Sequence, residues 1–145
     1  MKKLFLSFLM MLTLLPLAAA NKYDPPDTIV VSRDGTGEFR TIEIAEDAEI
    51  TIEVNPGTAS KEKLKAYREA GINRISIGLQ AVQDRLLKSI GRIHNYSDFE
   101  NTFEWAREAG FDNINVDLML ALPNQTLEDL KESVKTIVNL KPEHI

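Results

Sequence analysis

The stretch REAGINRISIGLQ, from Arg68 to Gln80, decides the fold of this chain. Its beginning is typical of a helix that ends at Gly71, and its second half alternates apolar and polar side chains as a strand does. The same order returns in REAGFDNINVDLML, from Arg107 to Leu120, with Gly110 at the stop position. A repeated unit of helix, glycine and strand predicts crossover connections and therefore a parallel sheet.

Elements on either side of this repeat follow the same logic. Residues 49–55 alternate apolar and polar side chains, which predicts a strand ahead of the repeat. Ser60 is placed to cap a helix that reaches Ala70. Three more helices are expected, near residues 83–90, from a Ser97/Glu100 capping box to Ala109, and from Thr126 and Asp129 to Leu140. Thr28–Ser32 is expected to be a short strand, and 39–44 either a second strand or the approach to a helix.

The expected strands carry a polar face, whereas strands of parallel sheets are usually apolar on both sides. Glu53, Gln80 and Asp117 lie toward the C-terminal ends of their strands, where βα folds hold their ligands. We therefore predict that these three side chains line one polar cavity. Two alternatives stay open, namely an antiparallel sheet with one solvated face, and an inward ion pair of Arg74 with Glu53 or Asp117.

Size and composition restrict the classes of function. The chain has 145 residues and a formal net charge of -5. This length suits one domain and is too short for a complete (β/α)8 barrel, which needs about 250 residues. No basic stripe is present, which argues against nucleic-acid binding. There is no cysteine, so this chain offers no disulfide, no thiolate nucleophile and no thiolate ligand for an iron–sulfur cluster.

The N-terminal residues are typical of an export signal. Lys2 and Lys3 precede an apolar run that ends at Ala18-Ala19-Ala20. We expect residues 1–20 to be a signal peptide, and its removal to leave no stable membrane span. An N-terminal membrane anchor or a buried helix is the alternative. Residues 21–48 are expected to form a linker and a short β segment, and residues 49–145 the main α/β unit.

Three blocks of the sequence resemble one known family in order and spacing. They are EITIEVNPG (Glu49–Gly57), GINRISIGLQ (Gly71–Gln80), and NVDLM (Asn115–Met119) followed by Leu122-Pro123. Over about residues 49–145 the chain resembles the oxygen-independent coproporphyrinogen III oxidase-like proteins and related haem chaperones, which are radical S-adenosylmethionine (SAM) proteins. The resemblance implies a partial (β/α) barrel of about three parallel strands with helices on one face, truncated at both ends.

The resemblance also implies cofactors and residues. It implies SAM, a [4Fe-4S] cluster and a relation to haem or porphyrin, and it assigns SAM contacts to Glu53, Gln80, Arg92 and Asp117. The residue types fit, because carboxylates accept hydrogen bonds from ribose hydroxyls or an ammonium, and arginine binds a carboxylate through two parallel hydrogen bonds. For Arg92 alone, a solvated cation at a helix end is the alternative.

The chain departs from this family in one decisive respect. The CxxxCxxC cluster motif and the glycine-rich segment after it are absent, so we expect this chain, although oxidoreductase-like by resemblance, to be inactive by itself and unable to bind the cluster.

The N-terminal part resembles a different family. TIVVSRDGTGEFRTI (Thr28–Ile42) resembles the start of secreted pectinesterases and includes none of their catalytic carboxylates. This resemblance, and the export signal on an otherwise cytoplasmic family, indicate a junction of two unrelated pieces near residues 44–49. A secreted carbohydrate-active fragment and a non-catalytic interaction module that uses open sheet edges are the alternative functions.

Overall fold

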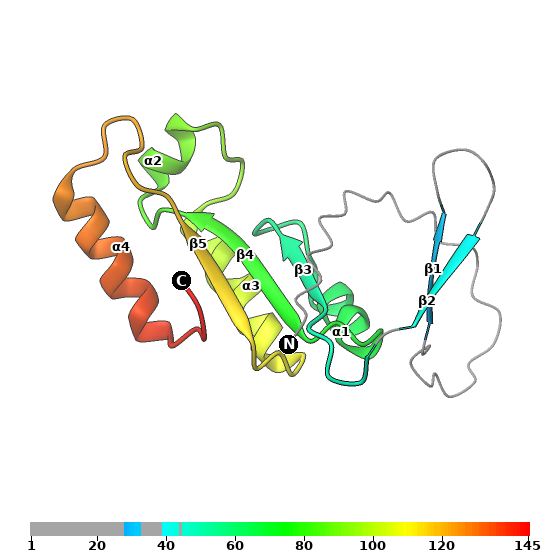
Figure 1. Ribbon diagram of the computed structural model, residues 1–145. Coiled ribbons are helices and arrows are strands. Elements are labelled where there is room, and N and C mark those ends of the chain that lie inside the picture. The colour runs from blue at the N-terminus through cyan, green and yellow to red at the C-terminus, as the bar shows by residue number, and fades with distance from the viewer. Residues whose placement is uncertain (1–27, 33–38, 44) are drawn as a thin grey trace.

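The computed structural model describes residues 28–32, 39–43 and 45–145 (Figure 1). The predicted signal peptide, at residues 1–20, lies outside the described residues. The described part contains two sheets and four helices. No helix in these described ranges is both long enough and apolar enough to cross a membrane.

The larger sheet has three strands in the order β3-β4-β5, formed by Thr51–Val54, Arg74–Gln80 and Ile114–Leu118. Both pairings are parallel, so the predicted parallel sheet is confirmed and the antiparallel alternative is wrong. β3 is shorter than the strand predicted for residues 49–55. Just before β3, the Ile50 N–H donates to the side-chain oxygen Asn73 Oδ1 at 2.8 Å.

Four helices connect these strands or follow them: α1 (Lys61–Glu69), α2 (Asp84–Ser89), α3 (Tyr96–Glu108) and α4 (Leu127–Leu140). The predicted cap of α1 is confirmed, since the Ser60 side chain accepts from the Lys63 N–H. The capping box that begins α4, made by Thr126 and Asp129, is also confirmed.

The predicted start of α3 is wrong by two residues. The capping box is made by Asn95 and Asp98 rather than by Ser97 and Glu100. Asn95 Oδ1 accepts from the Asp98 N–H and Asp98 Oδ2 accepts from the Asn95 N–H, each at 2.9 Å. Asparagine is as good an N-cap as serine, and aspartate completes the box here as glutamate would. The sequence therefore fits the capping-box pattern at two starting positions, Asn95 and Ser97.

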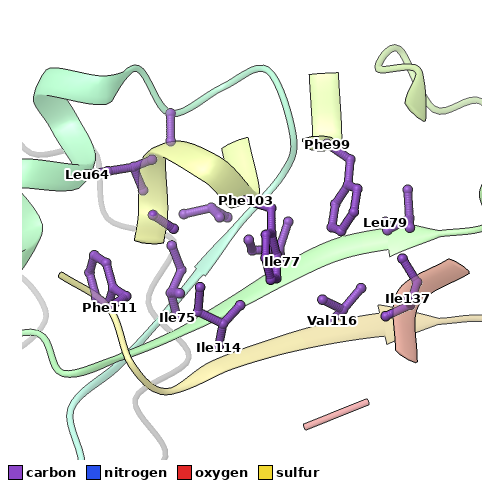
Figure 2. Packing of buried hydrophobic residues seen from close by; sticks show 13 residues of the cluster. Leu64, Ile75, Ile77, Leu79, Phe99, Phe103, Phe111, Ile114, Val116 and Ile137 are labelled. Atoms are coloured by element: carbon purple, nitrogen blue, oxygen red, sulfur yellow. The ribbon is translucent and has the colours of Figure 1, made fainter. Parts of the chain in front are cut away.

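The helices pack on the apolar face of the sheet (Figure 2). The strand register aligns Ile75 with Ile114 and Ile77 with Val116, and all four side chains are fully buried. Helices cover this row with the buried residues Leu64, Phe99, Phe103, Ala106 and Ile137. Burying an aliphatic side chain of this size contributes about 1.5–3 kcal/mol, so this interface fixes the sheet relative to α1, α3 and α4.

A second, smaller sheet lies in the N-terminal part. β1 (Thr28–Ser32) and β2 (Phe39–Glu43) pair in antiparallel fashion. The strand predicted at 28–32 is therefore confirmed, and residues 39–43 form a second strand rather than the approach to a helix.

Candidate functional site

Polar side chains meet on the face of the large sheet opposite the core. The register places Glu53 beside Ser76 and Ser76 beside Asn115. Partner residues in neighbouring strands point to the same side of a sheet, so these three side chains form one row across β3, β4 and β5. Asp117 lies two residues after Asn115 and shares that face. We call this surface, with Glu53, Ser76, Asn115, Asp117 and Gln80, the polar face.

A hydrogen-bond network holds the centre of the polar face. Asn115 Nδ2 donates to Ser76 Oγ at 2.9 Å and to Asp117 Oδ1 at 2.7 Å, while Ser76 Oγ donates to Asp117 Oδ2 at 3.1 Å. Ser76 is buried, whereas Asp117 and Glu53 are exposed. The hydrogen bonds from Ser76 and Asn115 therefore orient the Asp117 carboxylate, and its exposed side remains accessible to a ligand.

Gln80 reaches the polar face through an irregularity in β4. The pairing with β5 shifts register between Ile77 and Gln80, so that Gln80 rather than Leu79 aligns with Leu118. Gln80 has φ +77°, a value that residues other than glycine rarely adopt, and its carbonyl oxygen accepts from the Met119 N–H at 2.9 Å. Bulges of this kind redirect a side chain, and they are frequent next to functional sites.

The absence of a side chain at Gly78 makes room for Gln80. A β-carbon at Gly78 would lie only 3.1 Å from Gln80 Nε2 and 3.5 Å from Asn55 Oδ1. The carboxamide of Gln80 therefore lies back over Gly78, next to the residue that follows β3. Gln80 is almost completely buried in this position, with 8% of its surface exposed.

Arg92 approaches the same end of the sheet from the loop after α2. Its Nη1 donates to Asn55 Oδ1 at 2.7 Å, and its backbone N–H donates to the Leu87 carbonyl oxygen at 3.0 Å. The side chain is half-buried. The guanidinium therefore contacts the residue that follows β3, while the assignment of Arg92 to a SAM site and the alternative of a solvated cation at a helix end both stay predictions.

The alternative of an ion pair between Arg74 and Glu53 or Asp117 is wrong. Arg74 Nε lies 3.9 Å from Glu49 Oε1, and Arg74 Nη1 donates to Thr51 Oγ1 at 3.4 Å. Both contacts lie at the N-terminal end of the strands, away from Gln80. Among residues 45–145, no lysine, arginine or histidine nitrogen lies within 4.0 Å of the Glu53 or Asp117 carboxylate, so neither is neutralised by this part of the chain.

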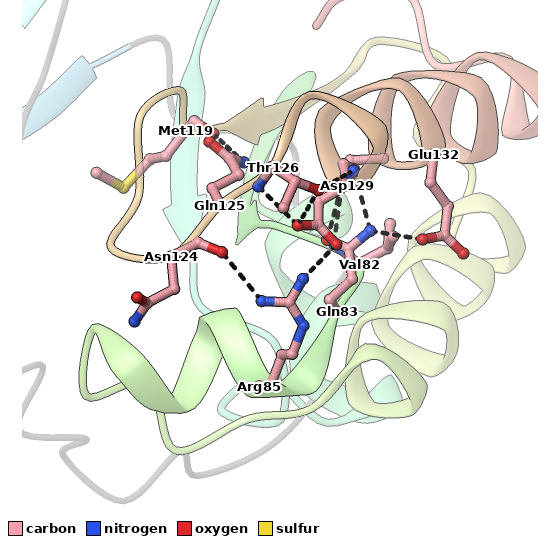
Figure 3. A network of polar contacts seen from close by, with 10 residues as sticks. Val82, Gln83, Arg85, Met119, Asn124, Gln125, Thr126, Asp129 and Glu132 are labelled. Atoms are coloured by element: carbon pink, nitrogen blue, oxygen red, sulfur yellow. Dashed lines mark hydrogen bonds and ion pairs between the residues drawn. The ribbon is translucent and has the colours of Figure 1, made fainter.

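A second polar network joins the loop after β4 to α4 (Figure 3). Gln83 Nε2 donates to the Asp129 carbonyl oxygen at 3.0 Å, and Ser133 Oγ donates to Gln83 Oε1 at 3.2 Å. The Arg85 guanidinium contacts the Asp129 carboxylate. Hydrogen bonds from Thr126, together with Arg85, lower the pKa of Asp129 to about 2. This network anchors the segment between Gln80 and α2 to a helix that packs on the sheet.

The four residues predicted to bind a ligand thus lie on three neighbouring strands and one loop. Glu53, Gln80 and Asp117 share the polar face, and Arg92 contacts the end of the adjacent strand. Sequence reasoning did not identify Asn55 as the partner of Arg92, because the two are 37 residues apart. Nothing in the alternation of the strands indicated that Ser76 and Asn115 hold Asp117.

The residue types fit SAM and do not fit an iron–sulfur cluster. Two unneutralised carboxylates, a carboxamide and a guanidinium match the ammonium, hydroxyl and carboxylate groups of SAM. A [4Fe-4S] cluster needs thiolate ligands, and the sequence contains no cysteine. The described residues contain no group of three or more histidine, aspartate or glutamate side chains placed to hold a metal ion.

Comparisons with known proteins identify the family of this chain. The sequence model of the Radical SAM superfamily matches residues 27–137. The heme chaperone HemW of Bacillus subtilis is 50% identical over 97 residues, which cover 67% of this chain and 26% of that protein. The oxygen-independent coproporphyrinogen III oxidase of Synechocystis is 37% identical over 102 residues, which cover 70% of this chain and 22% of that protein. The chain thus spans about a quarter of the length of the curated relatives it matches.

Solved structures show the same relation. Coproporphyrinogen III oxidase (HemN) from Escherichia coli, a radical SAM enzyme, superposes with a TM-score of 0.61 at 34% identity, covering 66% of this chain and 22% of that one. The radical SAM methyltransferase TsrM from Kitasatospora setae has a TM-score of 0.58 at 19% identity, covers 66% of this chain and 18% of that one, and shows the shared fold alone. The three parallel strands with their helices are therefore part of a radical SAM barrel.

These matches also bear on the N-terminal part. The superfamily match includes residues 28–42, and the comparisons give no support to the pectinesterase resemblance of that segment or to a signal peptide. The carbohydrate-active alternative is accordingly not favoured. By the superfamily match, the curated relatives and the HemN structure, this chain belongs to the radical SAM superfamily and, within it, to the coproporphyrinogen III oxidase-like and haem chaperone family.

Proposed function

We propose that the polar face is part of a SAM-binding surface, and that this chain by itself binds SAM weakly without cleaving it. The observation that carries the proposal is the convergence of Glu53, Gln80 and Asp117 on one face at the C-terminal ends of parallel strands, with Arg92 beside them. In βα folds that end of the strands holds the ligand.

Each side chain has a chemical role in this proposal. Glu53 and Asp117 accept hydrogen bonds from ribose hydroxyls or from the ammonium group, because both are exposed carboxylates without a cationic partner among residues 45–145. Gln80 both donates and accepts through its carboxamide. Arg92 binds the SAM carboxylate, for which its guanidinium offers the donors not used by Asn55.

The proposal includes no reductive step on this chain. When bound, the [4Fe-4S] cluster of radical SAM proteins supplies the electron that cleaves SAM, and this sequence offers no thiolate to hold it. Anaerobic reconstitution with iron and sulfide is therefore expected to yield no cluster absorbance. The relatives' names, heme chaperone and coproporphyrinogen III oxidase, lead us to propose a role in haem or porphyrin metabolism for the whole protein to which these residues correspond.

Equilibrium dialysis of the full chain against radiolabelled SAM tests the proposal. We expect saturable binding of the wild-type chain, and roughly tenfold weaker binding of Glu53→Gln, because a hydrogen bond to a charged group contributes about 1.5–3 kcal/mol. Glu104→Gln makes the same chemical change on the exposed side of α3 and serves as the control. An equal effect of both substitutions, or no saturable binding by the wild-type chain, would contradict the proposal.

A further inference from the structure

His94 is a buried polar residue that none of the roles above uses. It lies between α2 and α3, and only 6% of its surface is exposed. Its Nε2 lies 3.3 Å from the carbonyl oxygen of Leu79, the residue directly before Gln80 in β4. A carbonyl oxygen only accepts hydrogen bonds, so Nε2 carries the proton in this contact.

The bond to His94 occurs at the bulge of β4. The described strands pair Val54 with Ile77 on one side of β4 and Gln80 with Leu118 on the other, and neither register includes Leu79. A buried carbonyl oxygen without a partner costs about 1–3 kcal/mol. His94 satisfies this group, and in doing so it stabilises the irregular backbone that gives Gln80 its positive φ.

The same side chain fixes the loop that carries Arg92. On one side of Arg92, Gly91 has φ +73° and the Arg92 N–H donates to Leu87. On the other side, His94 enters the interior while its neighbour Ile93 is 94% exposed. The loop is therefore attached to the end of β4 by one hydrogen bond, which couples the position of Arg92 to that of Gln80.

We propose that His94 is a positioning residue, which holds Gln80 and Arg92 in the arrangement that binds SAM by donating a hydrogen bond to the Leu79 carbonyl oxygen. This inference rests on the proposed function for its effect on SAM, while its structural part does not depend on SAM. His94 makes no contact with ligand in this account, because it is buried beneath the loop.

Two substitutions separate the hydrogen bond from the bulk of the ring. His94→Leu replaces the ring by an apolar side chain that still fills much of its space but has no donor, and we expect the Kd for SAM to rise roughly threefold to tenfold. His94→Gln returns an N–H donor and is expected to restore the affinity to within about threefold of wild type. Asn101→Leu, at an exposed position of α3, is the control and is expected to leave the Kd unchanged. Equal affinities of His94→Leu and wild type would overturn the inference.

Nuclear magnetic resonance tests the structural part without SAM. In the wild-type chain we expect the His94 ring to carry its proton on Nε2, and a neutral ring protonated only on Nδ1 would overturn the inference even if both His94 variants fail to fold. In His94→Leu, the amide resonances of Gly78, Gln80 and Arg92 are expected to shift, and in His94→Gln to return toward wild type. A wild-type chain that does not bind SAM while these shifts occur would contradict the proposed function and leave the role of His94 intact.

Discussion

Arg92 Nη1 donates to Asn55 Oδ1 at 2.7 Å, across 37 residues of sequence. This contact connects a loop that follows one strand to the end of the neighbouring strand. It places a guanidinium at the C-terminal edge of the polar face before any ligand is present. Such preorganisation lowers the entropic cost of binding, because the arginine side chain does not have to be ordered by the ligand.

Removal of the partner of Arg92 is expected to weaken SAM binding. In Asn55→Leu the arginine loses its acceptor and regains rotamer freedom, so we expect the Kd for SAM to rise about threefold to tenfold. Isothermal titration calorimetry measures this change. Asn101→Leu, at an exposed position of α3, is the control. An unchanged Kd for Asn55→Leu would show that this contact does not contribute.

A methyl group at Gly78 is expected to displace the Gln80 carboxamide. The added β-carbon would lie 3.1 Å from Gln80 Nε2, which is closer than ordinary contact, and the flexible end of Gln80 is what can move. We expect Gly78→Ala to reduce SAM affinity severalfold while the free energy of unfolding changes by less than about 1 kcal/mol. Dialysis against SAM and urea unfolding measure the two quantities. A loss of stability well beyond this value, with unchanged affinity, would contradict the assignment.

The capping box of α3 gives a prediction about stability. Asn95→Ala removes the side-chain acceptor of the Asp98 N–H, and we expect a loss of about 1 kcal/mol in the free energy of unfolding. Ser97→Ala lies inside the helix and is expected to have little effect. Chemical denaturation of both variants distinguishes the two positions. A larger loss for Ser97→Ala would place the start of α3 where the sequence first suggested.

Asp129 makes stability depend on pH in a defined direction. Hydrogen bonds from Thr126 and Arg85 hold its folded-state pKa at about 2, below the ordinary value of 3.8. A depressed carboxyl pKa contributes stability that is fully present above the unfolded-state pKa and is lost as the pH falls through the folded-state pKa. We therefore expect wild type to be more stable than Asp129→Asn at pH 7, and the difference to shrink between about pH 4 and pH 2.

Thermal unfolding at several pH values measures this dependence. Asp112→Asn, at an exposed position before β5, is the control. We expect its stability to change between pH 7 and pH 2 by the same amount as the stability of wild type. A stability difference between wild type and Asp129→Asn that grows as the pH falls would have the wrong sign and would contradict the assigned ion pair.

The sequence predicted the parts of the fold that depend on periodicity. Alternation in residues 74–80 and the glycine stop at Gly71 were sufficient to predict a parallel strand after a helix. Alternation in the neighbouring strands likewise placed Glu53 and Asp117 on one face. The start of α3 was missed because two overlapping capping patterns occur within residues 95–100, and local sequence does not decide between them.

The contacts that complete the site could not be predicted in this way. The bulge at Gln80 lies beside the Leu79 carbonyl oxygen, which contacts His94 from 15 residues away. The bond between Arg92 and Asn55, and the contact of Arg74 with Glu49 instead of Glu53 or Asp117, depend on tertiary packing of loops and strand ends. Residues 1–20 lie outside the described residues, so their assignment as a signal peptide stays a prediction.

The claim on which this account depends is that SAM binds over the polar face. Titration of SAM into the isotope-labelled full chain, followed by amide chemical shifts, measures this most directly. We predict saturable shifts at Glu53, Gln80 and Asp117, and none at the exposed helix positions Glu104 and Lys135. Shifts confined to the helices, or no shifts at millimolar SAM, would contradict it.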